Sequence, residues 1–387
     1  MSNPNRKLPA DFVAGLRRAT GETGLLTDPA DCWPYGYDNS RRHALPQAVA
    51  FVQEPEQVAD ILRLCNRYGI RATARGKGTG TTGATVPDQG GVVLSFERMS
   101  RILEIDPANR LAVAEPGVTN EALQQALARE GFFWPPDPTS AAVCTIGGNL
   151  AYNAAGPRAV KYGTPRENTL GLEAVTGSGE PITTGVRTSK GVVGYDLTRL
   201  LIGSEGTLAL ITQATLKLTP LAESQRTLRA IYADIHGAAA AVSAIMAQPV
   251  TPCSLEFMDG TAIAMVRDYV DLGLPAETGA LLMIEVDGPA ACIEHAAATL
   301  AAVARTPAAL EVKVAADAQE VALLWKARKA LSPALRNIAP KKINEDVVEP
   351  VACMGEYIDG LERRSRETGI RIVNCGHAGN GNIHVNL

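Results

Sequence analysis

The glycine-rich segment Arg75–Gly83 is the feature that most narrows the folds open to this chain. It contains the spacing G-x-G-x-x-G, with Glu97 near the place of the ribose-binding acid of a nicotinamide-binding Rossmann fold. Only Ala84–Gln89, interrupted by Pro87, separate it from the glycines of the next predicted strand. A crossover helix needs about 10 to 12 residues, so we expect the segment to join two strands directly and exclude a Rossmann fold. Its backbone N–H groups and hydroxyls can still wrap a pyrophosphate, or the segment can be a plain turn.

The composition indicates a globular protein of about two to three domains. The 387 residues are 46% hydrophobic and 20% charged, with a net charge of -4. This balance gives no electrostatic footprint for nucleic acid or an anionic membrane. We see no signal peptide and no apolar run of the ~18 residues that span a bilayer, so we expect a cytoplasmic location. The seven cysteines form no C-x-x-C pair and are predicted to be reduced thiols.

Hydrophobic patterning divides the chain into an N-terminal helical segment, 1–45, and two larger domains, 46–220 and 221–387. Expected helices are 11–20, 55–68, 119–130, 237–247, 290–304 and 318–335; expected strands are 48–53, 69–74, 90–96, 110–115, 170–176, 208–218, 229–232, 281–287 and 311–315. The stretch 131–163 shows little regular pattern. Loops this long are usually functional or disordered, and this one has too many apolar residues for a flexible linker.

Two further motifs follow in the first large domain. One combines Pro136–Ser140, which reads Pro-Asp-Pro-Thr-Ser, with Thr145–Gly156, whose paired glycines and asparagines let a flat ligand lie against bare backbone. Gly203–Leu208 places glycines on both sides of a Ser-Glu pair, which again suggests a close approach to backbone. Each segment taken alone is also compatible with an ordinary irregular loop.

The end of the chain carries two of its five histidines in a glycine-rich setting. Residues 370–375 are predicted to form a buried strand. In the strand that follows, apolar and polar residues alternate, which places His384 and Asn386 on one face. The glycines and asparagines between the strands exclude a helix and allow a tight loop. His377 and His384 can therefore converge on one metal ion or one substrate.

Together and in this order, these segments resemble the PCMH-type FAD-binding domain of the vanillyl-alcohol-oxidase superfamily. Within it the chain looks most similar to the D-2-hydroxy acid dehydrogenases, which include the glycolate oxidase catalytic subunit, D-lactate dehydrogenase and D-2-hydroxyglutarate dehydrogenase. The resemblance runs from about Phe51 to Leu387 and includes the Lys-Tyr-Gly of 161–163 and the terminal His-Ala-Gly-x-Gly-Asn-x-His. It implies an α+β fold with a two-subdomain FAD-binding domain followed by a cap, or substrate, domain of antiparallel sheet and helices. It also implies that the family's C-terminal segment is missing here.

The resemblance assigns cofactor binding to residues of all three glycine-rich regions. They are Arg75, Gly76, Lys77, Gly78, Thr79 and Gly80 at the pyrophosphate, Thr139, Ser140, Gly147, Gly148, Asn149 and Asn153 along the flavin and ribityl chain, and Glu205 and Ile211 close by. The segment 75–83 contains neither His nor Cys, so no covalent flavin tether is expected there, and neither His43 nor Cys144 indicates one. The FAD is therefore expected to be non-covalent.

The second large domain carries the implied substrate contacts. Trp325, Arg328 and Ser332 follow helical spacing, which puts Arg328 and Ser332 on one face. A lone arginine on a helix is more often solvated, but the resemblance makes Arg328 a clamp for the substrate carboxylate. By the same resemblance, Lys342 faces the substrate.

The terminal histidines are implied to be metal ligands. His377 and His384 would bind zinc, manganese or iron, which residue type does not distinguish, and Asn386 would lie beside them as a catalytic group. Asn380 stands where many relatives carry Asp, which removes an expected outer-shell hydrogen bond to a histidine. A complete metal site needs at least three protein ligands, and the sequence offers two candidates.

The activity implied by the resemblance is FAD-dependent oxidation of a D-2-hydroxy acid, of the D-lactate, glycolate or D-2-hydroxyglutarate type. A base takes the hydroxyl proton, hydride passes to flavin N5, and electrons leave for a cytochrome, a quinone, an electron-transfer flavoprotein or oxygen. Two other interpretations stay open: a catalytically silent FAD-binding subunit or inactive fragment, and a non-redox relative of the alkyl-glycerone-phosphate synthase type. The histidine pair argues against a silent subunit and against a non-redox relative, but the interpretation as an inactive fragment stays open. Membrane association would run through an acceptor partner, and the sequence allows a homodimer without indicating one.

Overall fold

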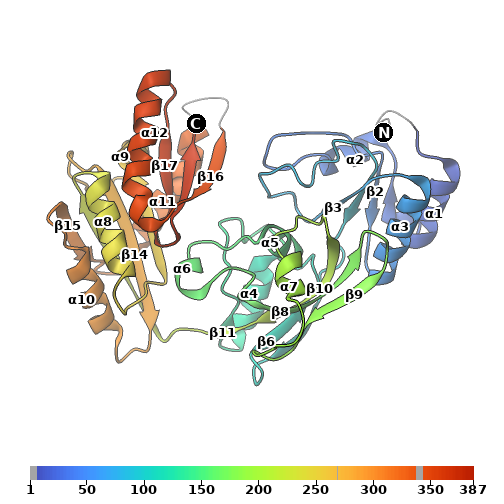
Figure 1. Cartoon of the computed structure of the whole chain (residues 1–387), viewed down its shortest axis with the longest axis horizontal. Helices are drawn as coiled ribbons and strands as arrows, with labels where there is room; N and C mark the ends of the chain where they lie inside the picture. The colour runs from blue at the N-terminus through green and yellow to red at the C-terminus, as the bar shows by residue number, and fades with distance from the viewer. Residues whose placement is uncertain (1–6, 268, 337–342) are drawn as a thin grey trace. The chain divides into compact units, whose positions relative to one another are not determined.

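The computed structural model describes residues 7–267, 269–336 and 343–387, without the side chains of 332, 333 and 336. The chain folds into two compact units (Figure 1). Unit 1 combines the residues up to Gly156 with Gly163–Leu221, and unit 2 combines Pro157–Tyr162 with Ala222–Leu387. The chain therefore passes from one unit to the other at three places.

Unit 1 begins with a four-stranded sheet in the order β1-β2-β4-β3. Its elements are β1 (Leu25–Leu26), β2 (Ala48–Phe51), β3 (Ala72–Arg75) and β4 (Val92–Ser95), with α1 (Ala10–Thr20), α2 (Pro29–Cys32) and α3 (Pro55–Tyr68). β1 belongs to the segment that the sequence predicted as helical, and it extends this sheet by pairing with β2. α3 follows a capping box formed by Glu54 and Gln57 and ends at Gly69, whose φ of 63° suits glycine. Phe12 of α1 and Ile61 of α3 are fully buried in the shared core.

The connection between β3 and β4 confirms that the glycine-rich segment joins two strands directly. Residues 76–91 are all described, and none of them is helical. β3 nevertheless lies parallel to β4, with Arg75 opposite Ser95. The crossover is made by irregular backbone in which Gly78 and Gly83 have φ of 66° and 87°. Because a left-handed φ is costly for residues with a Cβ, glycine is what permits this path.

A five-stranded antiparallel sheet in the order β5-β6-β10-β8-β9 forms the rest of unit 1. Its elements are β5 (Ile102–Asp106), β6 (Leu111–Ala114), β8 (Thr169–Thr176), β9 (Pro181–Gly185) and β10 (Ala209–Lys217), with α4 (Asn120–Arg129), α5 (Ile146–Tyr152), α7 (Leu197–Leu201) and the short pair β7 (Phe132–Phe133) and β11 (Thr219–Pro220). The helices share one core with this sheet. Trp134 is fully buried there, and its indole N–H donates to Asn168 O at 2.9 Å.

The stretch 131–163 is more regular than the sequence predicted, because it contains β7, α5 and the short helix α6 (Ala159–Tyr162). α5 forms despite its two glycines because Thr145 caps it, accepting a hydrogen bond from Gly148 N–H at 3.3 Å. Ile146 and Leu150 lie four residues apart and are both buried on its inner face. Asn153 ends the helix with a left-handed φ of 51°.

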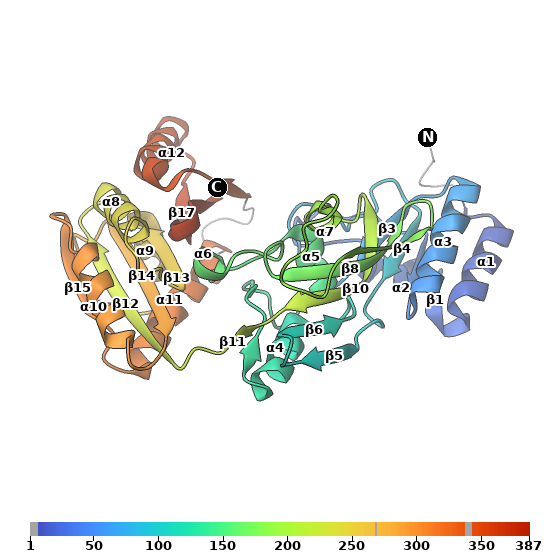
Figure 2. The ribbon, with the colours of Figure 1, turned by 60° about the horizontal axis from the view of Figure 1, so that its bottom comes forward.

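Unit 2 is built on a seven-stranded antiparallel sheet in the order β15-β12-β14-β13-β17-β18-β16. Its elements are β12 (Ser224–Tyr232), α8 (Ile235–Met246), β13 (Ser254–Asp259), α9 (Gly260–Val266), β14 (Ala280–Gly288), α10 (Ile293–Ala304), β15 (Ala309–Val314), α11 (Ala318–Arg336), β16 (Asn344–Val348), α12 (Met354–Thr368), β17 (Val373–His377) and β18 (Asn382–Asn386). α8, α10 and α12 share a core with one face of the sheet, and α9 and α11 share a core with the other (Figure 2). This arrangement confirms the expected α+β class.

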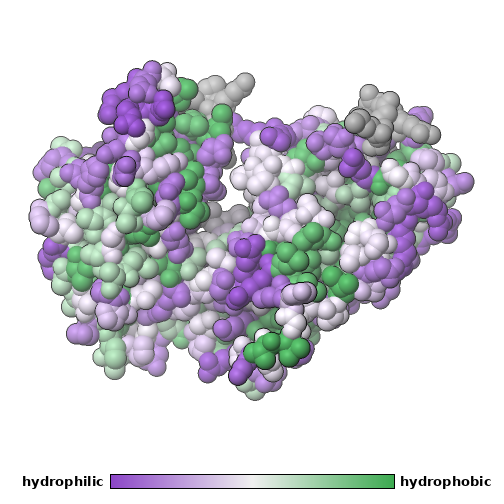
Figure 3. All heavy atoms as spheres, in the orientation of Figure 1, coloured by the Kyte–Doolittle hydropathy of each residue, from purple (hydrophilic) through white to green (hydrophobic). Residues whose placement is uncertain are grey.

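The surface of unit 2 follows from the amphipathic pattern of its helices. α12 buries Met354 and Ile358 and exposes Glu362, Arg363 and Arg364, and Figure 3 shows hydrophilic residues gathered over it.

None of the described helices in either unit combines the length and the apolar character that a membrane crossing requires. The seven cysteines are free thiols, five of them buried.

Helix α6 belongs to unit 2, although the chain on either side of it belongs to unit 1. Lys161 Nζ donates to both the backbone oxygen and the carboxylate of Asp287, and the Tyr162 hydroxyl donates to Asp287 Oδ2 at 2.7 Å. A Cβ on Gly379 would lie 2.4 Å from the Val160 side chain, so the two segments pack at van der Waals distance. The segment 157–162 is thereby fixed to β14 and to the turn that follows β17.

The terminal hairpin pairs β17 with β18 and confirms the alternation predicted for the last strand. Ile383 and Val385 are buried in the core shared with α8, α10 and α12, so His384 points to the opposite face. The first strand of the hairpin is Val373–His377, three residues later than the predicted start at 370. Its register sets Cys375 opposite His384, which brings His377 diagonally next to His384 on one face.

Replacing the glycine in the turn of this hairpin tests the backbone conformation of the turn. Gly381 has a φ of 66°, and a Cβ there would lie 1.8 Å from Glu349 O; Gly369 has a similar φ of 69° but open space around it. We expect Gly369→Ala to cost about 1–2 kcal/mol of unfolding free energy from backbone strain alone. Gly381→Ala should cost about 1–3 kcal/mol more, because the neighbouring backbone must move. Denaturant unfolding of both variants measures the difference, and equal losses would contradict this turn.

Candidate functional site

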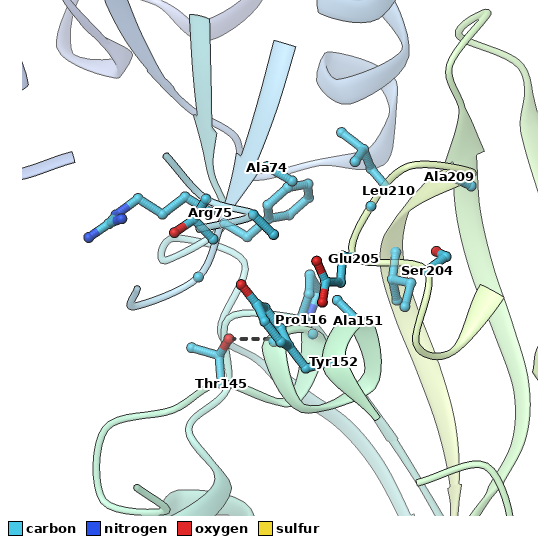
Figure 4. Close-up of a pocket in the computed structure, with 18 of the residues that line it drawn as sticks. Ala74, Arg75, Pro116, Thr145, Ala151, Tyr152, Ser204, Glu205, Ala209 and Leu210 are labelled. Carbon is cyan, nitrogen blue, oxygen red and sulfur yellow. Dashed lines mark hydrogen bonds between the residues drawn. The ribbon is translucent and has the colours of Figure 1, made fainter. Parts of the chain in front are cut away.

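Unit 1 contains a pocket of about 580 Å³, shown in Figure 4. It is lined by Ala74, Arg75, Gly76, Ala84, Thr85, Phe96, Pro116, Thr145, Gly147, Gly148, Ala151, Tyr152, Leu201, Ser204, Glu205, Gly206, Ala209, Leu210 and Ile211. The walls are mostly apolar, with a few polar groups among them. A mostly apolar lining with a few polar groups is typical of a small-molecule or cofactor site.

Glycine lets three segments meet at this pocket. A Cβ on Gly76 would lie 2.5 Å from Thr145 Oγ1, and a Cβ on Gly147 would lie 2.5 Å from the Pro116 side chain. Thr145 is itself held in place because its hydroxyl caps α5. The backbone of the glycine-rich loop therefore lies directly against the start of α5, and no side chain at Gly76 or Gly147 can intervene.

Arg75 lines the pocket but directs its guanidinium away from it. Its Nη1 donates to Tyr37 O at 2.5 Å and its Nη2 to Pro34 O at 3.3 Å. Figure 4 shows the side chain extending away from Glu205. Burial lowers the pKa of Arg75, with Asp38 among the groups that oppose the shift. Arg75 thus ties β3 to the segment before β2, which is a structural role beside any contact with a ligand.

Glu205 connects the glycine-rich loop to the segment before β10. It has an unusual left-handed φ of 52° for a residue with a side chain. The Thr82 hydroxyl lies 3.2 Å from Glu205 Oε2 and 3.4 Å from the Tyr152 hydroxyl. Burial raises the pKa of Tyr152, so the phenol stays protonated near neutral pH. A carboxylate and a phenol are therefore positioned side by side at the pocket wall.

The pocket includes part of the set that the family resemblance assigned to the cofactor. Six of those residues line it: Arg75, Gly76, Gly147, Gly148, Glu205 and Ile211. Eight do not: Lys77, Gly78, Thr79, Gly80, Thr139, Ser140, Asn149 and Asn153. Asn149 Oδ1 accepts from Asn120 Nδ2 at 3.0 Å, and Asn153 Oδ1 accepts from Arg166 N–H at 3.2 Å. Lys77 instead pairs with Glu97 at 3.3 Å.

Tyr152 is one of four polar lining residues, with Thr85, Thr145 and Ser204, that were not predicted from the sequence as cofactor contacts. It follows Gly148 by four residues on α5, so both lie on the helix face that lines the pocket. Recognising 146–152 as a helix would have identified it. The glycine pair concealed that helix, because glycine disfavours a helix interior.

Unit 2 brings the two terminal histidines together. The imidazole rings of His377 and His384 have centroids 5.0 Å apart and meet edge to face at 86°. Nδ1 of His377 contacts Oε1 of Glu256, and Nδ1 of His384 contacts Oδ1 of Asp346. In both rings the nitrogen that faces a carboxylate is Nδ1, which makes Nε2 the atom for an outside partner.

Glu256 also binds Arg328. Arg328 Nε donates to Glu256 Oε2 at 3.0 Å, and the exposed fractions of the two side chains are 13% and 2%. Burial raises the pKa of Glu256, but His377 and Arg328 outweigh it and leave that pKa below its ordinary value. Arg328 is therefore not the solvated arginine that its helix position alone would suggest. It is held beside the histidine pair by a buried carboxylate.

Of the three other residues predicted to contact the substrate, the structure describes the side chain of one, Asn386. Asn386 is buried on the face of His384, and its Nδ2 donates to Val373 O and to His384 O, each at 3.1 Å. Lys342 and the Ser332 side chain lie outside the described residues. Asn380 is exposed in the hairpin turn, so the carboxylate partners of the histidines come from β13 and β16 instead.

Glu256 and Asp346 were not predicted from the sequence. Asp346 lies opposite His384 in the β16–β18 ladder, and Glu256 lies opposite His377 in the β13–β17 ladder. Neither belongs to a recognisable motif, so only strand register could have found them. Among the residues that the structure describes, the histidines are joined by no third His, Cys, Asp or Glu in an arrangement suited to a metal ion.

Comparison with known proteins agrees with this architecture. Residues 46–185 match the family described as "FAD binding domain", and residues 221–387 match "FAD linked oxidases, C-terminal domain". The chain is 38% identical over 375 residues to the "Glycolate oxidase subunit GlcD" of Bacillus subtilis, covering 97% of this chain and 80% of that protein. It is 36% identical to the "D-lactate dehydrogenase" of Archaeoglobus fulgidus, covering 92% and 79%.

Solved structures show the same fold at low identity. A p-cresol methylhydroxylase structure matches with a TM-score of 0.82 and 17% identity, covering 97% of this chain and 82% of that one. An alkyldihydroxyacetonephosphate synthase matches with a TM-score of 0.79 and 20% identity, covering 99% and 81%. The fold is thus that of the PCMH-type flavoproteins.

Within that class, the chain belongs to the FAD-linked oxidase family that includes the glycolate oxidase subunit GlcD and D-lactate dehydrogenase. Its cofactor is FAD, and it is an oxidoreductase. Most of the pocket lining, Ala74 to Tyr152, lies inside the region matched as the FAD-binding domain.

Gly148 tests whether the pocket of unit 1 is where FAD binds. A Cβ there would meet only Thr145 Oγ1, at 3.3 Å, so the methyl group of Gly148→Ala would occupy space in the pocket. We expect FAD affinity to fall by about 1–3 kcal/mol from overpacking. The FAD-free protein should lose no stability, because alanine favours a helix over glycine. Flavin titration and thermal unfolding measure the two quantities.

Gly177→Ala is the matched control, because Gly177 has open space around it and lies outside the pocket. It should leave FAD affinity unchanged. Unchanged affinity in Gly148→Ala as well would place the cofactor elsewhere.

Proposed function

We propose that this protein uses FAD to oxidise a small D-2-hydroxy acid to the 2-oxo acid. Its electrons then pass to a cytochrome, a quinone or an electron-transfer flavoprotein. The observation that carries the proposal is the cluster of Arg328, Glu256 and His377 in unit 2, which sets a carboxylate-binding guanidinium beside an imidazole. Glycolate and D-lactate, which appear in the names of the relatives, are both 2-hydroxy acids.

The chain's own residues divide the chemistry between them. Arg328 binds the substrate carboxylate end-on through its two Nη groups, while Glu256 holds its Nε. Where no metal ion occupies Nε2, His377 or His384 accepts the hydroxyl proton at that atom, since Nδ1 of each ring faces a carboxylate. A metal ion on the same Nε2 atoms would replace this role. A bound FAD would supply the acceptor for the hydride of the α-carbon. Proton and hydride thus leave the substrate toward separate acceptors.

The pocket of unit 1 is the proposed site of the flavin. Its apolar walls and the bare backbone of Gly76, Gly147 and Gly148 suit a flat ring system. Glu205 and Tyr152 supply polar groups at the wall. Ser332, Lys342 and Asn386 remain proposed substrate contacts, on the family resemblance.

The absorption spectrum of the flavin measures whether the proposed oxidation takes place. Anaerobic addition of D-lactate, glycolate or D-2-hydroxyglutarate to the FAD-loaded protein should bleach the flavin absorption bands with at least one of them. L-Lactate is the matched control and should leave the bands unchanged, because its hydrogen and hydroxyl are exchanged at the α-carbon. Flavin bands that no 2-hydroxy acid bleaches would favour the alternative of a silent FAD-binding subunit and contradict this proposal.

We also propose that His377 and His384 bind a divalent zinc, manganese or iron ion. Two imidazoles with carboxylates behind Nδ1 match the way metal-binding histidines are oriented in proteins, although the described residues add no third ligand. The ion would supply Lewis acidity at the substrate hydroxyl.

The metal proposal predicts that the purified protein retains such an ion through desalting. His384→Gln should weaken its retention about 10-fold or more, because it removes one of two imidazole ligands. His295→Gln, at an exposed position of α10, is the control and should retain the ion. Elemental analysis and metal titration measure this. Equal metal content in both variants would remove the metal from the proposal and leave the histidines as proton acceptors.

A further inference from the structure

Glu256 contacts both Arg328 and His377, and its effect on the protonation of His377 goes beyond the proposed reaction. It lies on β13, directly opposite His377 on β17, so its side chain and the imidazole stand on the same face of the sheet. Arg328 reaches that face from α11. The carboxylate is nearly closed off from water, with 2% of its side chain exposed. Each of its two oxygens faces one partner: Oε2 faces Arg328, and Oε1 faces His377.

The chemistry of the two partners fixes how the protons are arranged. A guanidinium has only donors, so Glu256 Oε2 must accept from Arg328. A buried carboxylate oxygen also requires a donor, and among the described residues His377 Nδ1 is the polar atom that Oε1 meets. The imidazole therefore carries its proton on Nδ1, which leaves the Nε2 lone pair for a proton or a metal ion.

We propose that Glu256 is a positioning residue that fixes the Nδ1–H tautomer of His377 and holds the Arg328 guanidinium beside it. This inference rests on the proposed function for its catalytic meaning, but the tautomer is a property of the protein alone. One carboxylate would then set both the group that receives the substrate proton and the group that binds the substrate carboxylate.

The change Glu256→Gln tests this with almost no change in shape. The amide offers one acceptor and one donor group, and Arg328 can use only the acceptor. The amide NH₂ must then face His377 Nδ1, which has to accept, so the imidazole proton moves to Nε2. In serine proteases, an acid-to-amide change behind the catalytic histidine lowers kcat by about 10⁴ through the wrong tautomer. We expect kcat to fall by about 10²–10⁴ here, with FAD content retained.

Histidine ¹⁵N NMR gives a readout that a purely structural role would not move. The chain has five histidines, so His377 can be assigned by comparison with His377→Gln. The unaltered protein should show a proton on Nδ1 of His377, and Glu256→Gln should show it on Nε2. A proton on Nε2 with none on Nδ1 in the unaltered protein overturns the proposal, whether or not the variant folds.

Glu285→Gln is the matched control. Glu285 lies on the neighbouring strand β14, is buried, and accepts from Trp325 Nε1 at 2.7 Å and from the Thr227 hydroxyl at 3.1 Å. The change removes the same charge without touching a histidine. It should leave the His377 tautomer unchanged and kcat within about twofold, as expected of a site with no shared partner. Equal losses of kcat in both variants, with the tautomer unmoved, would overturn the positioning role.

The two proposals fail separately. If no 2-hydroxy acid bleaches the flavin but the tautomer behaves as described, the reaction is wrong and the positioning by Glu256 stands. If the flavin bleaches but Glu256→Gln keeps the proton on Nδ1 and keeps kcat, the reaction stands and the role of Glu256 is wrong.

Discussion

A charge in the interior of a protein is stable only where other groups replace the water that it has lost. Glu256 is such a charge, and the arrangement of unit 2 around it follows from this requirement. Its two donors come from different elements: Arg328 from α11 and His377 from β17. Glu256 and His377 are 121 positions apart in the chain, so the cluster forms only when β13 and β17 pair. The geometry of the site is therefore a consequence of sheet order.

Unit 1 builds its pocket by a different means. Segments from β3, the start of α5 and the region before β10 meet where side chains are absent, and glycine is what allows that approach. The polar groups that hold the segments together are few. They include the Thr145 cap of α5, the contacts of the Thr82 hydroxyl with Glu205 and Tyr152, and the backbone bond from Glu205 N–H to Ala151 O at 2.9 Å. The same short backbone distances that shape the pocket leave little room for substitution in its walls.

The sequence alone predicted the structure correctly where the outcome depended on the spacing of residues close together in the chain. The few residues between the loop glycines and the next strand excluded a crossover helix, and the alternation around His384 placed that side chain on the face opposite the core. The order of the glycine-rich motifs also identified the family. Each of these inferences depends on neighbours in the chain, whose spacing the backbone geometry fixes.

Features that depend on distant partners could not be predicted in this way. Glu256 belongs to no motif, and its importance follows only from a strand register set far away in sequence. The cofactor contacts of Asn149 and Asn153 stay predictions, and the sequence did not reveal that Asn149 also bonds Asn120 and that Asn153 also bonds Arg166. An asparagine that satisfies a buried polar group and one that faces a ligand look identical in a sequence. Packing alone distinguishes them.

The placement of α6 has a consequence for how the protein can be divided. Because residues 157–162 belong to unit 2, three crossings of the chain connect the units, and one cut near Leu221 leaves two of them intact. A fragment that begins at Ala222 would lack Lys161 and Tyr162, the donors that meet the Asp287 carboxylate. It would also expose the face of the turn at Gly379 that Val160 covers. Unit 2 is therefore a discontinuous domain. During synthesis, residues 157–162 are made well before residues 222–387, so this part of unit 2 must wait for the remainder before it can pack.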